Sequence, residues 1–401
     1  MRGGPPGQGP PARGPIGVAL TLIVALGALV LARTGLRQGL LYALGLGCGV
    51  TLYQSRFSFS AAFRQAVAHG QGRDVRAHLL LLAATSVVCA PLLAYAPRVF
   101  GVPPHGVVAP VGVGVAVGAV LFGLGMQLGG ACAGGLLYDV GSGYVALLVT
   151  LAGFLGGTVL GAWHWRFWTY TLPSLPPVSL AQGPWGYGGA LAAQLGALGL
   201  LALATAVVAR RHPAPPAQVA RSRGTRGLRG PWPVWVGALL LAALNALTLL
   251  VKGTPWGITS AFTLVGSRVA GALGVPVASW AYWAGPRAGS LHAPLLADAT
   301  VVMDGGIVLG ALLAAALAGT LVLRRPIAWP TAAVALGGRV LMGYGAVLAD
   351  GCTVGGYLGG IASFSLHGWL WAGMALVGTS VGGRLVTRRG VPVIRLPRPD
   401  W

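Results

Sequence analysis

The stretch Leu121–Gly135, LFGLGMQLGGACAGG, returns about 220 residues later as Leu341–Gly356, LMGYGAVLADGCTVGG. When the two copies are laid over each other, Cys132 falls on Cys352, and three glycines and a leucine also coincide. The whole chain has only four cysteines. A cysteine at the same place in each of two glycine-rich copies therefore indicates a duplicated structural unit with a shared role for the thiols.

The composition is that of a membrane protein. Hydrophobic residues make up 55% of the 401 positions and charged residues only 8%, against about 25% in ordinary soluble domains. The formal net charge is +21, which alone could suggest a nucleic-acid partner. The basic residues stand in short clusters between long apolar runs, however, as the positive-inside rule requires of a chain that crosses a lipid bilayer many times. We expect a bilayer and no nucleic acid as its partner.

Apolar runs predict the fold class, an all-α polytopic membrane protein, because a spanning helix needs about 20 mostly apolar residues. The first run is followed by Arg33 and Arg37 and by no small-residue cleavage pattern, which favours a retained helix over a signal peptide. We expect ten spans, at residues 16–32, 39–54, 79–96, 107–128, 143–163, 187–209, 232–252, 303–323, 331–348 and 368–386.

The distribution of positive charge predicts the orientation. With ten spans, 19 of the 27 Lys and Arg residues fall on one side and seven on the other, while Arg339 falls within a span. Positive charge is enriched on the cytoplasmic side. We therefore expect both termini in the cytoplasm and the protein in the cell inner (cytoplasmic) membrane.

A second repeat divides the chain into halves, because FSFSAAF at 57–63 matches WGITSAF at 256–262. Five spans, the second to the sixth, separate the start of the first half from the start of the second. An odd number reverses the second half, so we expect inverted repeats with the substrate site where they meet. The predicted organisation starts with an N-terminal tail and extra helix (1–38) and a first half (39–211). A Pro- and Arg-rich flexible cytoplasmic linker (212–231), a second half (232–390) and a cytoplasmic tail (391–401) follow.

The motifs FGLGMQLGGACAGGLLY, GYGAVLADGCTVGGYLGGIASFSLHGWLW and RFSFSAAFR resemble those of the YeeE/YedE family of sulfur-compound transporters. The resemblance implies a nine-span hourglass with short re-entrant helices, to which 16–32 adds a span. It also implies that thiosulfate passes along cysteines in a narrow waist, and that a TusA-like cytoplasmic sulfur carrier is a partner. Two of these cysteines carry over onto Cys132 and Cys352. A third would fall in 57–59, where this chain has Ser58.

The candidate substrate-binding residues are Cys132, Cys352, Ser58, Gly130 and Gly351. A thiol is a weak, polarizable donor that can meet a soft sulfur atom without holding it tightly. Glycine lets the backbone approach a ligand and adopt positive φ. A helix that starts in either turn presents a positive dipole end to an anion. The sequence shows no P-loop and no metal-ligand spacing, so we expect no cofactor, metal or catalytic residue.

Several other residues have more than one interpretation. Cys48 and Cys89 are expected to pack as small hydrophobes. Arg339 either has a functional role within its span or reaches the interface. Asp350, beside Cys352, repels an anion unless it is protonated or paired. The remaining assignments are His367 as an anchor of its loop, Trp371 as a lipid-facing or packing residue, and Gly156 and Gly157 as close helix contacts.

Two alternatives stay open at this point. The missing third cysteine favours a selenium compound or another sulfur compound as the cargo. A membrane-bound sulfurtransferase that moves sulfur through Cys132 and Cys352 belongs to a different class, and would need a neighbouring base or positive charge to activate a thiol.

Overall fold

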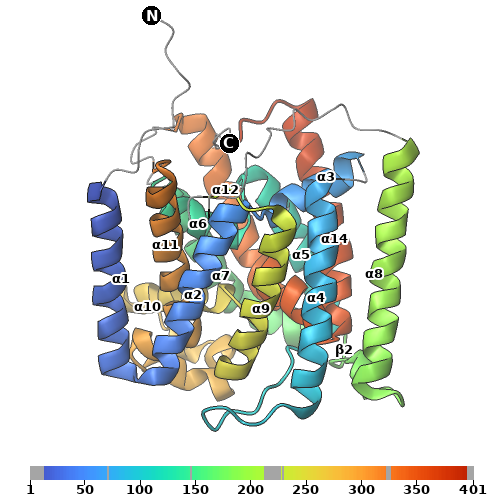
Figure 1. Cartoon of the computed structure of the whole chain (residues 1–401), viewed down its shortest axis with the longest axis horizontal. Coiled ribbons are helices and arrows are strands. Elements are labelled where there is room, and N and C mark those ends of the chain that lie inside the picture. The colour runs from blue at the N-terminus through green and yellow to red at the C-terminus, as the bar shows by residue number, and fades with distance from the viewer. Residues whose placement is uncertain are drawn as a thin grey trace, which may run out of the picture.

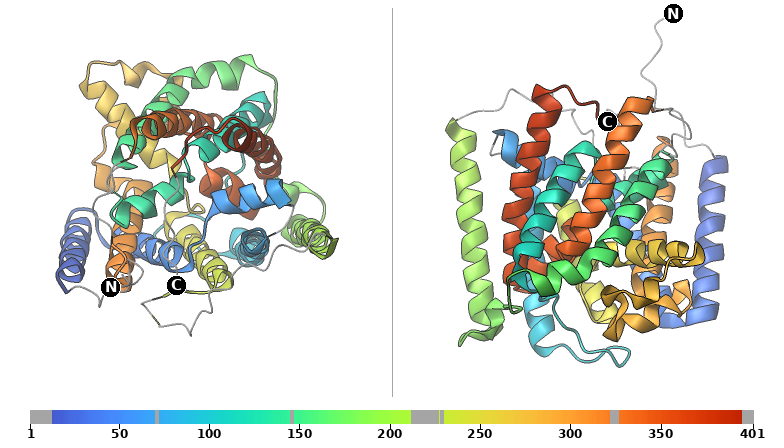
Figure 2. Two further views of the ribbon diagram at one scale, coloured as in Figure 1. Left: turned by 90° about the horizontal axis from the view of Figure 1, so that it is seen from above. Right: turned by 180° about the vertical axis from the view of Figure 1, so that it is seen from behind.

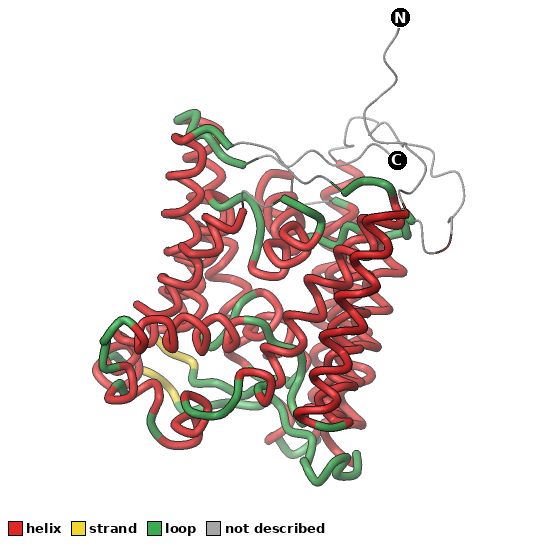
Figure 3. The backbone as a smooth tube through the Cα atoms, turned by 90° about the vertical axis from the view of Figure 1, so that its left-hand side faces the viewer, coloured by secondary structure: helices red, strands yellow, loops and turns green. Residues whose placement is uncertain are grey.

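A computed structural model of the chain describes residues 13–69, 72–144, 147–211, 227, 230–321 and 327–394. Almost all of this part is helical, and its only strands are β1 (Val111–Gly112) and β2 (Ser174–Leu175), which pair antiparallel near the lower end (Figure 3). The predicted N-terminal tail, most of the linker and the last residues of the predicted C-terminal tail lie outside the described residues.

Long helices alternate in direction between the lower end and the upper end, where α14 finishes (Figure 1). Each of the ten predicted segments overlaps one of them. They are α1 (Arg13–Thr34), α2 (Leu36–Ser55), α4 (Arg73–Tyr95), α5 (Val113–Leu128), α7 (Leu147–Arg166), α8 (Gly186–Arg211), α9 (Val234–Lys252), α11 (Ala299–Ala318), α12 (Trp329–Leu348) and α14 (Leu366–Arg388).

Eight helical stretches in the described ranges are long and apolar enough to cross a membrane, and α2 and α14 are outside that group. The structure thus confirms an all-α, multi-pass membrane protein, while the count of ten spans stays a prediction. α1 and α8 stand at opposite edges of the bundle (Figure 2) and bury few of their side chains. Their exposed Val and Leu side chains suit contact with lipid.

Four short helical segments lie within or beside this frame: α3 (Phe59–His69), α6 (Ala133–Gly141), α10 (Thr259–Ala272), and the pair η8 (Thr353–Gly359) and α13 (Gly360–Ala362). α3 and α6 lie toward the upper end and α10 toward the lower end (Figure 1). The segment after α13 joins lower-end loops, where the Leu180 N–H donates to Phe364 O at 2.7 Å. Inverted halves would place the short helices in this way, and the inversion itself stays a prediction.

Short turns complete the lower end of the molecule. They are η1 (Phe167–Thr171), η2 (Leu180–Gln182), η4 (Val277–Ser279), η5 (Ala281–Trp283), η6 (Gly285–Leu291) and η7 (Leu295–Ala297).

Several predicted boundaries are wrong by four to six residues, among them the start of 79–96, where α4 already begins at Arg73, and two of them have identifiable reasons. The segment 107–128 becomes helical only at Val113, because Pro110 and the two residues of β1 that follow it hold the backbone extended. The segment 303–323 begins earlier, at Ala299, because the Asp298 carboxylate accepts hydrogen bonds from the N–H groups of Thr300 and Val301 at 2.9 Å and so caps α11.

Close helix contacts form where glycines face a neighbouring backbone. In α7, a Cβ added at Gly157 would lie against the backbone of Val340 and Tyr344 in α12. Gly161 and Gly153 meet the same helix. The interpretation of Gly156 as a close contact is wrong, because the space around it is open. Small residues therefore draw α7 and α12 together along one face of each helix.

This difference between adjacent glycines gives a matched test of packing. Gly157→Ala is expected to lower stability by about 1–3 kcal/mol, because the methyl group overpacks the contact with α12. Gly156→Ala should be neutral or stabilising by up to about 1 kcal/mol, because alanine has the higher helix propensity. Thermal unfolding of both variants in detergent measures the contrast, and equal melting temperatures would contradict the packing described here.

Candidate substrate pathway

Cys132 and Cys352 each stand at the start of a short interior helix. Cys132 caps α6, and its Sγ accepts a hydrogen bond from the Gly135 N–H at 3.3 Å. Cys352 caps η8, and its Sγ accepts from the Val354 N–H at 3.4 Å. The two side chains are 2% and 0% exposed. Sulfur thus stands at the N-cap, where hydroxyl or carboxylate oxygens are usual.

The two helices begin at one place in the interior. Thr353, the first residue of η8, has its hydroxyl beside the Cys132 thiol, and the two thiols are close enough to interact electrostatically. A Cβ added at Gly134 in α6 would lie 3.9 Å from the Val354 side chain. The N-terminal ends of α6 and η8, with their positive dipole ends, therefore meet at the cysteines.

Two threonine hydroxyls accompany the thiols. Thr353 lies beside Cys132, and Thr259, at the start of α10, lies beside Cys352. Apart from the thiols, neither hydroxyl has a hydrogen-bond partner among the described residues, although buried polar groups are ordinarily partnered. We call Cys132, Cys352, Thr259 and Thr353 the waist. The sequence reasoning missed both threonines, although Thr353 follows Cys352 and Thr259 matches Ser60 of the other repeat copy.

Arg339 holds the turn that carries Cys132. Its guanidinium donates to the carbonyl groups of Ala131 at 2.8 Å, Gly129 at 3.0 Å and Cys132 at 3.3 Å. The side chain is 1% exposed, so it does not reach the interface. Its positive charge lies behind the backbone of the waist, where it can favour an anion without blocking the path.

The two glycines adopt the positive φ that the sequence reasoning expected, at +81° for Gly130 and +142° for Gly351. The backbone of Gly351 is fully engaged. Its N–H donates to Ala346 O at 2.8 Å, and its carbonyl accepts from the Trp371 indole N–H at 3.1 Å. Trp371 is fully buried rather than lipid-facing. Gly351 therefore shapes the second turn, and Gly130 lines a cavity.

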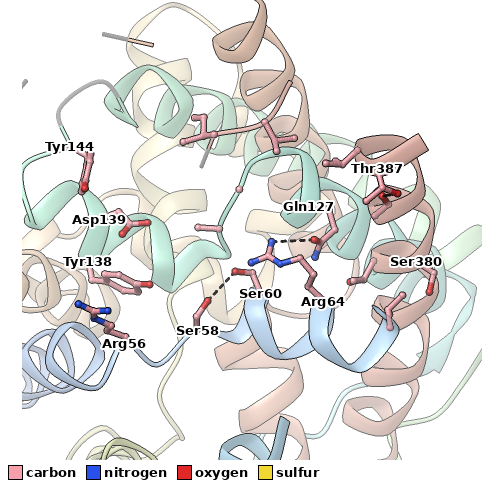
Figure 4. A pocket seen from close by; sticks show the side chains of 18 of the residues that line it. Arg56, Ser58, Ser60, Arg64, Gln127, Tyr138, Asp139, Tyr144, Ser380 and Thr387 are labelled. Carbon is pink, nitrogen blue, oxygen red and sulfur yellow. Dashed lines mark hydrogen bonds between the residues drawn. The ribbon is translucent and has the colours of Figure 1, made fainter. Parts of the chain in front are cut away.

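That cavity, the upper vestibule, has a volume of about 910 Å³ and opens beside the upper ends of α3 and α14. Figure 4 shows its polar side chains pointing inward from α3, α6 and α14. Four arginines and one aspartate line it, which gives it a positive balance: Arg56, Arg64, Arg384, Arg388 and Asp139.

Ser58 lies in the upper vestibule, next to α3. Its Oγ is 3.1 Å from Ser60 Oγ (Figure 4) and accepts from the Ala61 N–H at 3.3 Å. The hydroxyl thus caps α3 and also lines the cavity. Ser58 is not part of the waist.

A second cavity, the lower vestibule, has a volume of about 460 Å³ and is lined by residues that include His105, Trp165, Trp168, Arg287 and Asp350. Asp350, two residues before Cys352, faces this space and interacts electrostatically with Arg287. The Arg287 guanidinium also lies 4.5 Å from the centre of the Tyr282 ring. The negative charge beside the waist therefore has a positive partner.

The other singled-out residues have structural contacts. Cys48 and Cys89 are fully buried, and Asn245 Nδ2 lies 3.7 Å from the Cys89 thiol. His367 Nδ1 is 2.7 Å from Ser365 Oγ, which fixes the turn before α14. No cluster of three or more His, Cys, Asp or Glu side chains suited to a metal ion occurs in the described ranges.

Comparison with known proteins gives the family of the chain. The family described as "Sulphur transport" matches residues 54–381. The chain is similar to the "Thiosulfate transporter TsuA" of Spirochaeta thermophila, with 28% identity over 378 residues that cover 89% of this chain and 99% of that protein. It also resembles the "Probable transporter YedE" of Salmonella typhimurium, at 31% over 147 residues, or 37% of this chain and 35% of that protein.

The relative from Escherichia coli, also named "Probable transporter YedE", matches over the same share of each chain. The chain therefore spans about a third of the length of the YedE proteins. The family and these relatives are named for transport, which indicates a transporter of sulfur compounds rather than an enzyme. The match to the family extends over most of the chain, which belongs to the sulphur transport family.

Proposed function

We propose that this protein imports thiosulfate or a related inorganic sulfur anion, which moves from the lower vestibule through the waist to the upper vestibule. The observation that carries the proposal is the pair of buried thiols, Cys132 and Cys352, that cap two short helices; the turn before Cys132 lines the upper vestibule through Gly130 and Ala131, and the turn before Cys352 lines the lower vestibule through Asp350. The similarity to TsuA over nearly the whole length of both proteins supports the choice of anion.

The waist offers an anion weak but well-directed contacts. Each thiol can donate S–H to a soft terminal sulfur or to an oxygen, and the hydroxyls of Thr353 and Thr259 add a donor beside each thiol. Two helix dipoles and the Arg339 charge supply positive potential without direct contact. Weak sites suit conduction, because an anion bound tightly at the narrowest point would leave slowly.

The positive-inside rule gives the orientation. The sequence count puts most of the Lys and Arg residues on the side of the membrane at which α14 ends, and we assign that side, the upper end, to the cytoplasm of a cell with the protein in its inner membrane. With this orientation, import runs from the lower vestibule to the upper one. The four arginines of the upper vestibule then receive the anion after the waist, and Gly130 lets the backbone approach it there. A TusA-like carrier protein would collect the anion from this open, positively charged mouth.

A second cargo is favoured by one observation. Ser58 occupies the place of a family cysteine and lies in the upper vestibule, so the path has two thiols where the resemblance implies three. A selenium compound or another sulfur compound is therefore the alternative substrate within the same transport class.

The function is tested by uptake of radiolabelled thiosulfate, with sulfate, sulfite and selenite offered separately as competitors. We expect Cys132→Ala or Cys352→Ala to lower uptake roughly tenfold or more, which corresponds to the loss of about 1.4 kcal/mol of favourable contact. Cys48→Ala and Cys89→Ala, at buried thiols outside the waist, are the matched controls and should keep most of the activity. Near-normal uptake by the Cys132 and Cys352 double variant would show that these thiols only pack.

Ser58 gives a graded test of the path. Ser58→Ala removes a helix cap worth about 1 kcal/mol and one polar contact in a wide cavity, so we expect a partial loss of uptake, far smaller than for Cys132→Ala. Ser58→Cys should be tolerated, because it restores the family's thiol at nearly the same size. The measurement is the initial rate of thiosulfate uptake by the two Ser58 variants and the wild type at equal expression. If Ser58→Ala is as inactive as Cys132→Ala, Ser58 belongs to the narrow part of the path.

A further inference from the structure

Import of an anion with two negative charges is opposed by a membrane potential that is negative inside, in proportion to the charge moved. If the proposed function holds, a co-transported cation would lower that opposition. A proton can fill this role where a carboxylate within the membrane alternately binds and releases it. The inference below rests on the proposed function and concerns which residue carries the proton.

Asp304 in α11 stands apart from the other carboxylates of the described residues. It is 7% exposed, and neither of its carboxylate oxygens has a hydrogen-bond partner among the described residues. By contrast, the Asp298 carboxylate caps α11, and Asp74 accepts a hydrogen bond from Gln65 Nε2 at 2.9 Å. Asp350 and Asp139 line the two vestibules. Asp304 is thus a buried carboxylate with unused hydrogen-bonding capacity.

The charged and titratable groups near Asp304 come from several elements. Lys252 at the end of α9 and Asp298 at the start of α11 act on it most strongly. The Cys48 thiol of α2 lies nearby, and Arg37 of α2 acts on Lys252 from the other side. The Lys252 ammonium donates to Thr300 Oγ1 at 3.2 Å, so it supplies positive charge without a hydrogen bond to the carboxylate. That charge also disfavours a metal cation at this place.

A polar path links this region to the waist. Thr300 Oγ1, which accepts from Lys252, is 3.1 Å from Ser260 Oγ in α10. Ser260 follows Thr259, whose hydroxyl lies beside Cys352. Asp304 is one helical turn beyond Thr300 and on the same face of α11, and it is within electrostatic range of Cys352.

We propose that Asp304 binds the proton that is transported together with the anion. An anion at Cys352 adds negative charge to a dry region and so favours a proton on Asp304, and the bound proton in turn favours the anion. When the anion leaves toward the upper vestibule, Lys252 favours the ionised carboxylate, and the proton is released to the same side as the anion. The two binding events are thereby coupled.

The test uses the purified full chain in liposomes, with potassium and valinomycin to hold the membrane potential at zero. For the wild type with one proton per anion, a pH gradient of one unit, acidic outside, should raise thiosulfate accumulation about tenfold. Asp304→Asn should keep thiosulfate counterflow, which needs no net proton movement, and should lose the response to the pH gradient. Asp74→Asn, in the first turn of α4 at the upper end, is the matched control and should respond as the wild type does.

Either of two results would overturn the proposal. One is a response of Asp304→Asn to the pH gradient that equals the wild-type response, and the other is thiosulfate accumulation driven by a sodium gradient. If Asp304→Asn does not fold, a pH dye outside wild-type liposomes decides, because alkalinisation on addition of thiosulfate is required and its absence refutes proton coupling. Absence of thiosulfate counterflow in the wild type would instead refute the proposed function itself, and the role of Asp304 with it.

Discussion

The three hydrogen bonds that Arg339 donates to the carbonyl groups of Gly129, Ala131 and Cys132 are the interaction on which the pathway depends. Gly129 and Ala131 leave the helical pattern between α5 and α6, and their carbonyls accept no backbone hydrogen bond within a helix, whereas the Cys132 carbonyl also accepts from the Leu136 N–H of α6 at 2.9 Å. At membrane depth each unpaired backbone group costs several kcal/mol on the order-of-magnitude scale of apolar transfer. One guanidinium satisfies the carbonyls of Gly129 and Ala131 and adds a contact to that of Cys132, which allows an irregular turn to hold a thiol in the interior.

The second turn solves the same problem with a neutral group. The Trp371 indole N–H donates to the Gly351 carbonyl, and its ring stacks on Tyr357 of η8 with centroids 5.8 Å apart.

The charge of the side chains differs between the two ends of the proposed path. An aspartate with an arginine partner faces the lower vestibule, and four arginines face the upper one. Under the proposed function, an anion that enters from below would meet an increasingly positive environment, and the waist would contact it only with neutral thiols and hydroxyls.

Local patterns in the sequence predicted much of this arrangement. Apolar runs predicted where the long helices lie, and the matched glycine-rich copies predicted that Cys132 and Cys352 occupy equivalent turns. Boundaries were less predictable, since hydropathy alone does not distinguish the extended backbone before Val113 from helix. Contacts between the halves were also out of reach. Arg339 lies more than 200 positions from the carbonyls that it binds. The hydroxyls of Thr259 and Thr353 come to lie beside the thiols only when α6, η8 and α10 pack together.

The central claim is that an anion passes between the thiols of Cys132 and Cys352. It is tested most directly by locating selenosulfate, in which selenium replaces the terminal sulfur of thiosulfate, through the anomalous scattering of selenium in crystals of the protein. We predict a selenium peak at the waist, beside both Sγ atoms and the hydroxyls of Thr259 and Thr353. A peak confined to the vestibules, with the waist empty at saturating ligand, would contradict the account.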